Sequence, residues 1–337
     1  MQHLAVNFRL KSKTILGETM VKKLFFLFFA LIMLSLPLFA QVVDSTDTEE
    51  DDDFFERKHK RWWKSWTNKD WTDWELKGTP FIEGNYGIGK IENKNMFYDF
   101  KRIGLAELKL GYTTREDFFD EKIVEFSDKY FFISRLGSDI IETDPKLNEM
   151  RSEMWRFGFA KRTGYGYKLG SFSILPYNTS GFVWSRLHMK DFPPSVWPAI
   201  YPPLPGQIAA EADKAFLDRI NDTFRFGTNT EAGINFDIDS AVGFNIGYET
   251  SVLFPRHMFW KHLGSIIIEG AGNSLLEKFI DEISYSSPLS VPLVNFVLKG
   301  AYNYAFYSLK KEKMNWPFNT EAPLTYETIK FGMTFTF

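Results

Sequence analysis

Large apolar side chains recur at every second position along much of this chain, and this alternation limits the folds that it can adopt. In residues 223–237, aromatic, aliphatic and small residues share one side of an extended chain, while polar residues and glycine share the other. Residues 242–252 repeat the pattern after the short turn 237–240. The two stretches therefore predict a β-hairpin with both apolar faces on one side.

The same alternation appears, with more irregularity, in further segments of the chain. They are residues 82–89, 106–112, 155–162, 296–306 and 329–337. Residues 129–137, 165–175 and 180–187 are also strand-like, without a clear phase. Together these segments predict about eight to ten strands. Their polar sides carry nine charged residues that we expect to face an interior: Glu83, Glu107, Lys109, Arg156, Arg225, Glu231, Glu249, Lys299 and Lys330.

The apolar sides of these strands are unusually aromatic, in a chain with 18% aromatic residues and 35 Phe. A soluble β-sandwich would pack mainly Val, Ile and Leu between its layers. Aromatic side chains instead suit a surface that faces lipid and its interfaces. In hydrocarbon every backbone polar group needs an internal partner, so the strands must close on themselves. We therefore predict an all-β membrane protein, an antiparallel transmembrane β-barrel.

Two stretches break the alternation and show helical spacing instead. Residues 206–221 predict an amphipathic helix, which is preceded by Pro202, Pro203 and Pro205. Residues 255–285 predict one or two more helices, with a break near the glycines of 270–272. The predicted barrel therefore carries inserted amphipathic helices.

The N-terminal region predicts export from the cytoplasm. Residues 20–41 combine two lysines, an apolar run and a small residue at Ala40, which is the layout of a secretory signal peptide. A single membrane-anchor helix is the alternative for this run. We divide the chain into residues 1–40 (extension and signal peptide), a periplasmic arm at 41–78 and the barrel at 79–337. The absence of Cys excludes a disulfide framework.

The arm is first acidic, at residues 49–53, and then basic and rich in tryptophan. Tryptophan favours the membrane–water boundary, because its ring is apolar and its N–H needs a partner. We expect the tryptophans either at this interface or packed on their own fold: Trp62, Trp63, Trp66, Trp71 and Trp74. The formal net charge of -3 gives no reason to expect a nucleic-acid partner.

The end of the chain resembles the C-terminal signature of bacterial outer-membrane β-barrel proteins. Apolar residues alternate up to a terminal aromatic, here Phe331, Met333, Phe335 and Phe337. The resemblance implies the outer membrane of a Gram-negative bacterium, with outer-membrane lipid and the barrel-insertion machinery as partners. It also implies that both ends of the barrel lie in the periplasm. With 296–306 counted as a strand, the helical stretch 255–283 would lie on the periplasmic side.

Candidate catalytic groups are few. His188 shares a stretch with Ser185 and Asp191, but spacing alone does not place a base beside a nucleophile. His257 and His262 are poorly aligned for a shared metal, and no phosphate-binding glycine loop is present. The sequence thus predicts no cofactor and no metal site.

The leading functional hypothesis is a non-enzymatic outer-membrane barrel with a structural, binding or narrow transport role. Small barrels fill their interior with side chains, so a filled lumen is favoured over an open pore. One alternative is a barrel enzyme that acts on lipid or lipopolysaccharide, centred on His188. Another is a secretion or assembly partner that docks a periplasmic protein through the tryptophan-rich arm.

Overall fold

The computed structural model describes residues 77–119, 122–141, 149–190 and 205–337. The predicted signal peptide and the five tryptophans of the arm lie outside these residues. In the part of the chain that the structure describes, no helix is both long and apolar enough to cross a membrane.

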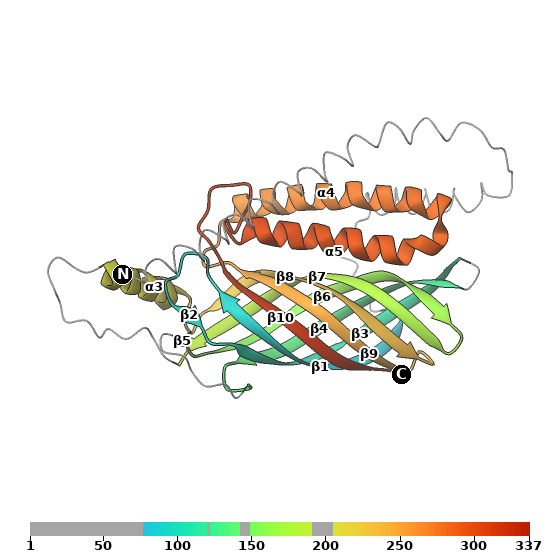
Figure 1. Cartoon of the computed structure of the whole chain (residues 1–337), viewed down its shortest axis with the longest axis horizontal. Coiled ribbons are helices and arrows are strands. Elements are labelled where there is room, and N and C mark those ends of the chain that lie inside the picture. Colours follow the sequence, from blue (N-terminus) through green and yellow to red (C-terminus); the bar gives the residue numbers. More distant parts are fainter. Residues whose placement is uncertain (1–76, 120–121, 142–148, 191–204) are drawn as a thin grey trace, which may run out of the picture. The chain divides into compact units, whose positions relative to one another are not determined.

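Eight long antiparallel strands close into a barrel (Figure 1). They are β1 Thr79–Glu92, β3 Ile103–Phe119, β4 Ile123–Gly137, β6 Ser152–Leu169, β7 Phe172–Met189, β8 Phe224–Ile238, β9 Val242–Leu253 and β10 Leu324–Thr336. The first and last strands pair with each other and leave no free edge. The prediction of an antiparallel barrel of eight to ten strands is confirmed, with eight.

The strands are strongly tilted. Following the paired residues once around the barrel from Phe81 leads back to β1 at Ile91, which is ten residues further along the strand (91 minus 81). Such an offset requires strands inclined to the barrel axis, as Figure 1 shows. A barrel of eight strands is just wide enough for side chains to fill its interior.

Short connections lie at one end of the barrel and long ones at the other. The short turns join β3 to β4, β6 to β7 and β8 to β9, and the barrel begins and ends beside them, so we call this the turn end. In the β8–β9 turn, Asp239 and Ser240 have left-handed φ values of 49° and 58°, as tight hairpin turns require. The opposite end, the loop end, carries β2 (Asp99–Phe100), β5 (Glu149–Met150), α3 (Pro205–Ile220) and the β9–β10 connection.

The β9–β10 connection holds a helical hairpin, formed by α4 (Phe259–Ser286), the short 3-10 helix η1 (Pro288–Ser290) and α5 (Val291–Lys310). The prediction of a strand at 296–306 is wrong, because this segment lies within α5. The predicted break at 270–272 is also wrong, since α4 is continuous. A Cβ at Gly272 would lie 2.3 Å from the phenolic oxygen of Tyr302, so this glycine allows the two helices to pack closely.

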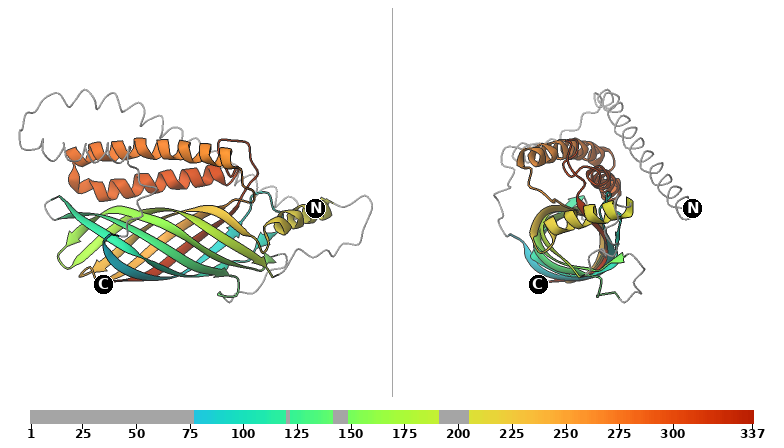
Figure 2. Two further views of the ribbon diagram at one scale, coloured as in Figure 1. Left: turned by 180° about the vertical axis from the view of Figure 1, so that it is seen from behind. Right: turned by 90° about the vertical axis from the view of Figure 1, so that its left-hand side faces the viewer.

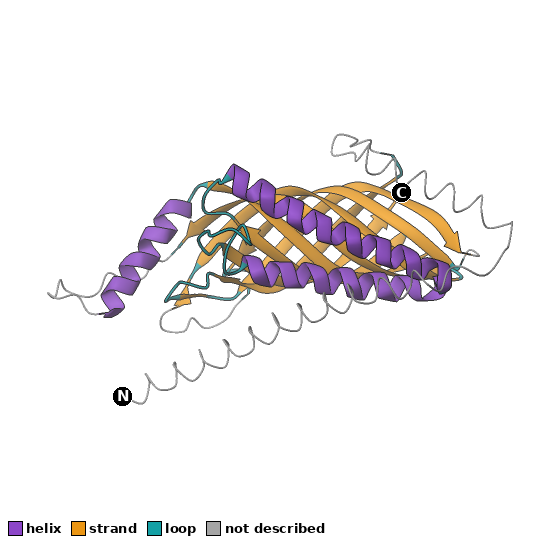
Figure 3. Cartoon of the chain, turned by 90° about the horizontal axis from the view of Figure 1, so that it is seen from above, coloured by secondary structure: helices purple, strands orange, loops and turns teal. Residues whose placement is uncertain are grey.

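The helical hairpin leaves the barrel at the loop end, which corrects its predicted side. Without a strand at 296–306, β9 and β10 are neighbours, and the connection between them starts at the end of the barrel opposite the start of β1 and the end of β10. The hairpin then runs back along the outer wall, where α5 packs against β6 to β9 (Figures 2 and 3). The hydroxyl of Tyr167, near the turn end, donates to the backbone oxygen of Leu289 (2.8 Å).

Two other predicted segments have clear outcomes. Residues 165–175 do not form one strand, since β6 ends at Leu169, Gly170 adopts a φ of 69° and β7 begins at Phe172. The helix predicted at 206–221 is present as α3. Two hydrophobic residues of α3, Leu217 and Ile220, belong to the apolar cluster at the loop end.

Candidate functional site: the filled interior of the barrel

The alternation of the sequence sorts side chains between the inside and the outside of the barrel. On β10, Lys330 is 1% exposed, whereas its neighbours Ile329 and Phe331 are 44% and 55% exposed. Phe335 and Phe337 are also exposed, while Met333 is half-buried. The outward apolar residues form a belt: Ile82, Tyr86, Ile88, Leu108, Leu110, Phe131, Ile133, Phe157, Phe159, Phe244, Ile246, Ile329 and Phe331.

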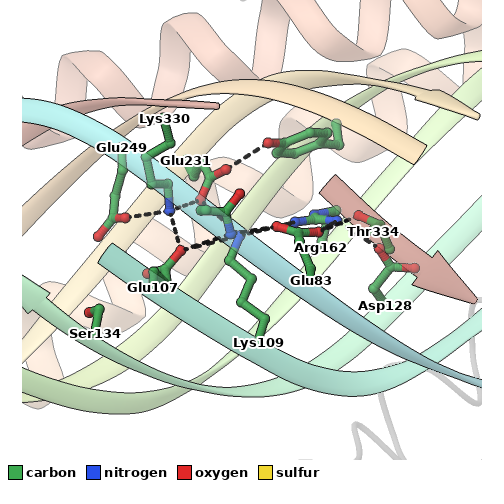
Figure 4. A network of polar contacts seen from close by, with 12 residues as sticks. Glu83, Glu107, Lys109, Asp128, Ser134, Arg162, Glu231, Glu249, Lys330 and Thr334 are labelled. Atoms are coloured by element: carbon green, nitrogen blue, oxygen red, sulfur yellow. Dashed lines mark hydrogen bonds and ion pairs between the residues drawn. The ribbon is translucent and has the colours of Figure 1, made fainter. Parts of the chain in front are cut away.

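Inside the barrel, charged side chains from seven strands form a continuous network (Figure 4). Arg156 donates to Glu249 (2.5 Å) and Glu107 (3.0 Å). Lys330 lies 2.6 Å from carboxylate oxygens of both Glu249 and Glu231, and 3.0 Å from Glu107. Each carboxylate is thus shared between cations of different strands, which ties distant parts of the wall together.

A second part of the network lies nearer the turn end. Arg162 donates to both oxygens of Glu83 (2.8 and 2.9 Å), a bidentate geometry that is among the strongest ion pairs in proteins. Lys109 binds the same carboxylate at 2.8 Å. Asp128 accepts a longer hydrogen bond from Arg162 (3.3 Å). The hydroxyl of Tyr177 donates to Glu231 at 2.6 Å, and the Arg162 guanidinium lies 4.5 Å from the centre of the Tyr177 ring, so Tyr177 joins this part to the first.

Apolar clusters fill the interior on both sides of the charges, one toward the loop end and one toward the turn end. At the loop end the cluster comprises Ile91, Tyr98, Phe100, Ile103, Leu105, Leu136, Met150, Met154, Leu187, Met189, Leu217, Ile220, Leu253, Leu324 and Tyr326. Toward the turn end, Val124, Phe126, Leu175 and Tyr177 form another. The interior is therefore filled in layers, with five carboxylates and four cations held between hydrophobic residues.

Seven of the nine residues predicted to face the interior meet in this network: Glu83, Glu107, Lys109, Arg156, Glu231, Glu249 and Lys330. Arg225 lies on the inward side of β8 but at the loop end, where it donates to the backbone oxygen of Arg219. Lys299 is misplaced by the prediction, because it lies on α5 outside the barrel and pairs with Glu277 of α4 (3.2 Å).

Three members of the network are missing from the predicted set. Arg162 follows Arg156 in the same phase of one strand, so the alternation alone could have identified it. Asp128 directly precedes the strand-like segment 129–137, and Tyr177 falls between the segments 165–175 and 180–187, so neither residue was assigned to a face. Their inward orientation follows from pairing with neighbouring strands, which is not visible in the local sequence.

The candidate catalytic residues are not assembled. His188 is exposed on the outer side of β7, with Nδ1 3.1 Å from Asp222. Ser185 is fully buried on the inner side of the same strand, so it cannot pair with His188. Asp191 lies outside the described residues. In the ranges that the structure covers, no three His, Asp or Glu side chains form a group that could hold a metal ion.

No protein-family model matches the sequence, and no curated protein matches it. Among solved structures, the chain is similar to Neisserial surface protein A (10% identity, TM-score 0.36, covering 77% of this chain and 97% of that one). It is also similar to Ail, the attachment invasion locus protein of Yersinia pestis (8% identity, TM-score 0.30, 77% and 100% coverage). These values are too low to carry an argument about function. The predicted resemblance to outer-membrane β-barrel proteins is confirmed at the level of the fold, a closed antiparallel barrel of eight strands.

Proposed function

We propose that this chain is an outer-membrane β-barrel protein with a sealed interior, which anchors and presents its loop end rather than conducting a solute. The observation that carries the proposal is the buried ionic network. A path through the barrel would have to separate its ion pairs. Breaking one buried pair costs about 3–5 kcal/mol, and the network holds several that share partners.

The membrane assignment rests on the outward belt. Its Phe, Ile, Leu and Tyr side chains are exposed around the barrel, where water would disfavour so large an apolar surface. Outer-membrane barrels have short periplasmic turns and longer extracellular loops. By this rule the turn end faces the periplasm, and the loop end with α3 faces the cell exterior.

Conductance tests the sealed interior directly. We expect the purified full-length protein, reconstituted into a planar lipid bilayer, to show no unitary current above the lipid baseline. A reproducible channel would contradict the proposal of a sealed anchor. Cell fractionation tests the location separately: we expect recovery with the outer membrane, and recovery in the soluble periplasm would refute it.

The enzymatic alternative has weaker support. His188 and Asp222 form an exposed pair, but the serine considered as nucleophile faces the other side of the wall. We therefore expect His188→Ala to leave the lipid and lipopolysaccharide profile of the cells unchanged. A changed profile would favour a lipid-acting enzyme. The role of a partner-docking arm is tested by deleting residues 41–74 and asking whether any co-purifying periplasmic protein is lost.

A further inference from the structure

The helical hairpin lies beside the same length of barrel wall that carries the apolar belt. Its tip reaches the turn end, where Tyr167 binds the backbone of Leu289. Halfway along α5, a Cβ at Gly300 would lie 3.7 Å from the Cβ of Ala232 on the wall. Near the loop end, the hydroxyl of Tyr307 donates to Glu327 of β10 (3.0 Å). The hairpin therefore follows the wall from one end to the other.

The outer faces of both helices are apolar. On α4 the exposed stripe follows helical spacing: Trp260, Leu263, Ile267, Ala271 and Leu275. Trp260 is 79% and Ile267 is 60% exposed. On α5 the exposed stripe is Leu293, Val297, Ala301 and Tyr304, and it carries no charge. The exposed charges of the α4 stripe, Lys278 and Glu282, are confined to its last turns, near the turn end. These faces have the same chemistry as the belt.

The wall beneath α5 carries polar side chains. Outward positions of β7, β8 and β9 carry Asn178, Thr230 and Thr250. Asn178 and Thr250 are each 4% exposed, and Asn178 donates to the backbone oxygen of Phe296 (3.4 Å). Thr230 and Thr250 hydrogen-bond each other at 2.9 Å. Polar groups that face hydrocarbon are costly, whereas small and polar residues favour close helix packing in membranes.

From these observations we infer that α4 and α5 form an intramembrane hairpin whose exposed stripes contact lipid acyl chains. Neither helix is apolar enough to cross a bilayer alone. The hairpin therefore keeps polar groups against the wall and between its helices, as the Asn178 contact with Phe296 and the Lys299–Glu277 pair show. It enters from the extracellular end, covers the polar strip of the wall and brings its tip to the periplasmic face. This inference rests on the proposed membrane barrel and its orientation. The interaction partner of the stripes is the hydrocarbon of the bilayer, because they continue the apolar belt over the polar strip of Asn178, Thr230 and Thr250.

Sidedness of labelling tests the position of the tip. The chain has no cysteine, so single cysteines can be placed at Ser287 in the tip, at Lys214 on α3 and at Ala241 in the β8–β9 turn. On intact cells, a membrane-impermeant maleimide should label the Lys214 position only. The other two should react after the outer membrane is permeabilised. If, on intact cells, the Ser287 position is labelled while the Ala241 position stays protected, the inference is overturned. If the Ala241 position is labelled on intact cells, the proposed orientation is overturned.

Contact with lipid is tested by nitroxide labels on the purified protein in lipid vesicles. We expect a label at Ile267 to show the high oxygen and low nickel-chelate accessibility of a label at Ile329 in the belt. A label at Lys214 should show the reverse. If Ile267 behaves like Lys214 while Ile329 is lipid-exposed, the hairpin is not in the bilayer. If Ile329 also behaves like Lys214, the proposed membrane barrel itself fails.

A matched pair of glycine variants tests the seam between the hairpin and the wall. At Gly300 a Cβ would already lie 3.5 Å from the Asn178 side chain, whereas at Gly270 it would meet nothing within 4 Å. Gly300→Leu should therefore push α5 from the wall and speed proteolytic cleavage within the hairpin at least several-fold. Gly270→Leu should leave the cleavage rate close to that of the wild type. Equal rates in the two variants would contradict a tightly docked hairpin.

Discussion

Replacing Arg156 by Met removes a buried cation that binds two carboxylates in the interior. The Arg156 guanidinium contacts Glu249, Glu107 and the hydroxyl of Ser134, and it is completely enclosed. Met has a similar reach but no charge, so the substitution leaves both carboxylates with Lys330 as a shared cation, and Glu107 also with Lys109 at 3.6 Å. We expect Arg156→Met to destabilise the barrel without changing its fold.

The expected loss follows from the geometry. Removing one partner of a buried ion pair costs about 3–5 kcal/mol, because the other charge stays buried. Lys330 still lies 2.6 Å from Glu249 and 3.0 Å from Glu107, which places the expected loss at the lower end of this range, about 3 kcal/mol. That loss corresponds to a change of about a hundredfold in the unfolding equilibrium.

Urea unfolding of the protein in lipid vesicles, followed by tryptophan fluorescence, would measure this loss. Lys214→Met is a matched control, because Lys214 forms an exposed ion pair with Asp218 (2.7 Å) on α3. Exposed pairs of this kind contribute roughly 0.3–0.5 kcal/mol. The double variant Arg156→Met/Glu249→Gln removes one charge of each sign and should cost less than the sum of its two single variants, by about 0.5–3 kcal/mol.

Two results would refute this reasoning. If Arg156→Met were no more costly than Lys214→Met, the network would not be buried and dry as the structure describes it. If the loss of unfolding free energy in the double variant equalled the sum of the losses in the two single variants, Arg156 and Glu249 would not be coupled. Their short contact would then not describe the protein in the membrane.

Three further predictions concern the wall, the chain end and the loop end. A Cβ at Gly332 would lie 1.9 Å from a buried asparagine oxygen, so Gly332→Val should lose the heat-modifiable gel mobility of a folded barrel. At Gly84 a Cβ would meet nothing within 4 Å, so Gly84→Val should keep this mobility. Removal of Phe337 should reduce the amount of protein in the outer-membrane fraction if the terminal aromatic serves as an insertion signal, and an unchanged amount would argue against that role. Burial alone would lower the pKa of Lys311, but its ion pair with Glu92 (2.8 Å) raises this pKa. The resulting stabilisation should be complete below the unfolded-state pKa of Lys311, about 10.4, and should be lost as the pH rises through its higher folded-state pKa. The urea midpoints of the wild type and of Lys311→Met should therefore converge only in strong alkali.

The barrel could be predicted from the sequence because its governing signal is local. A period of two places Arg156 and Glu249 on the polar side of their strands without knowledge of any partner. The aromatic character of the opposite side then separates a lipid-facing barrel from a soluble sandwich. Closure follows from the chemistry of the backbone in hydrocarbon.

The helical hairpin could not be predicted in the same way. Tyr302, Tyr304 and Phe306 fit a strand, while Leu298, Tyr302 and Phe306 fit one face of a helix equally well. The contact that accompanies the helical state, the Tyr302 ring against Gly272, joins residues that are thirty positions apart. The wrong assignment of Lys299 to the interior follows from this ambiguity.

Pairing across the interior was also beyond local reasoning. Arg162 and Glu83 are separated by 79 positions in the chain, and their bidentate contact depends on the ten-residue offset with which the barrel closes. The sequence indicates which charges point inward. The register decides which of them meet.

A nitroxide scan along β10 in lipid vesicles tests the central claim most directly. Labels at the outward positions Ile329, Phe331 and Phe335 should be accessible to oxygen dissolved in the lipid. Labels at the inward positions Thr328 and Thr334 should be shielded from both oxygen and the water-soluble nickel chelate. This alternation would establish a filled barrel with its aromatic side in the bilayer, and shielded labels at Ile329, Phe331 and Phe335 would show instead that this side is buried against protein.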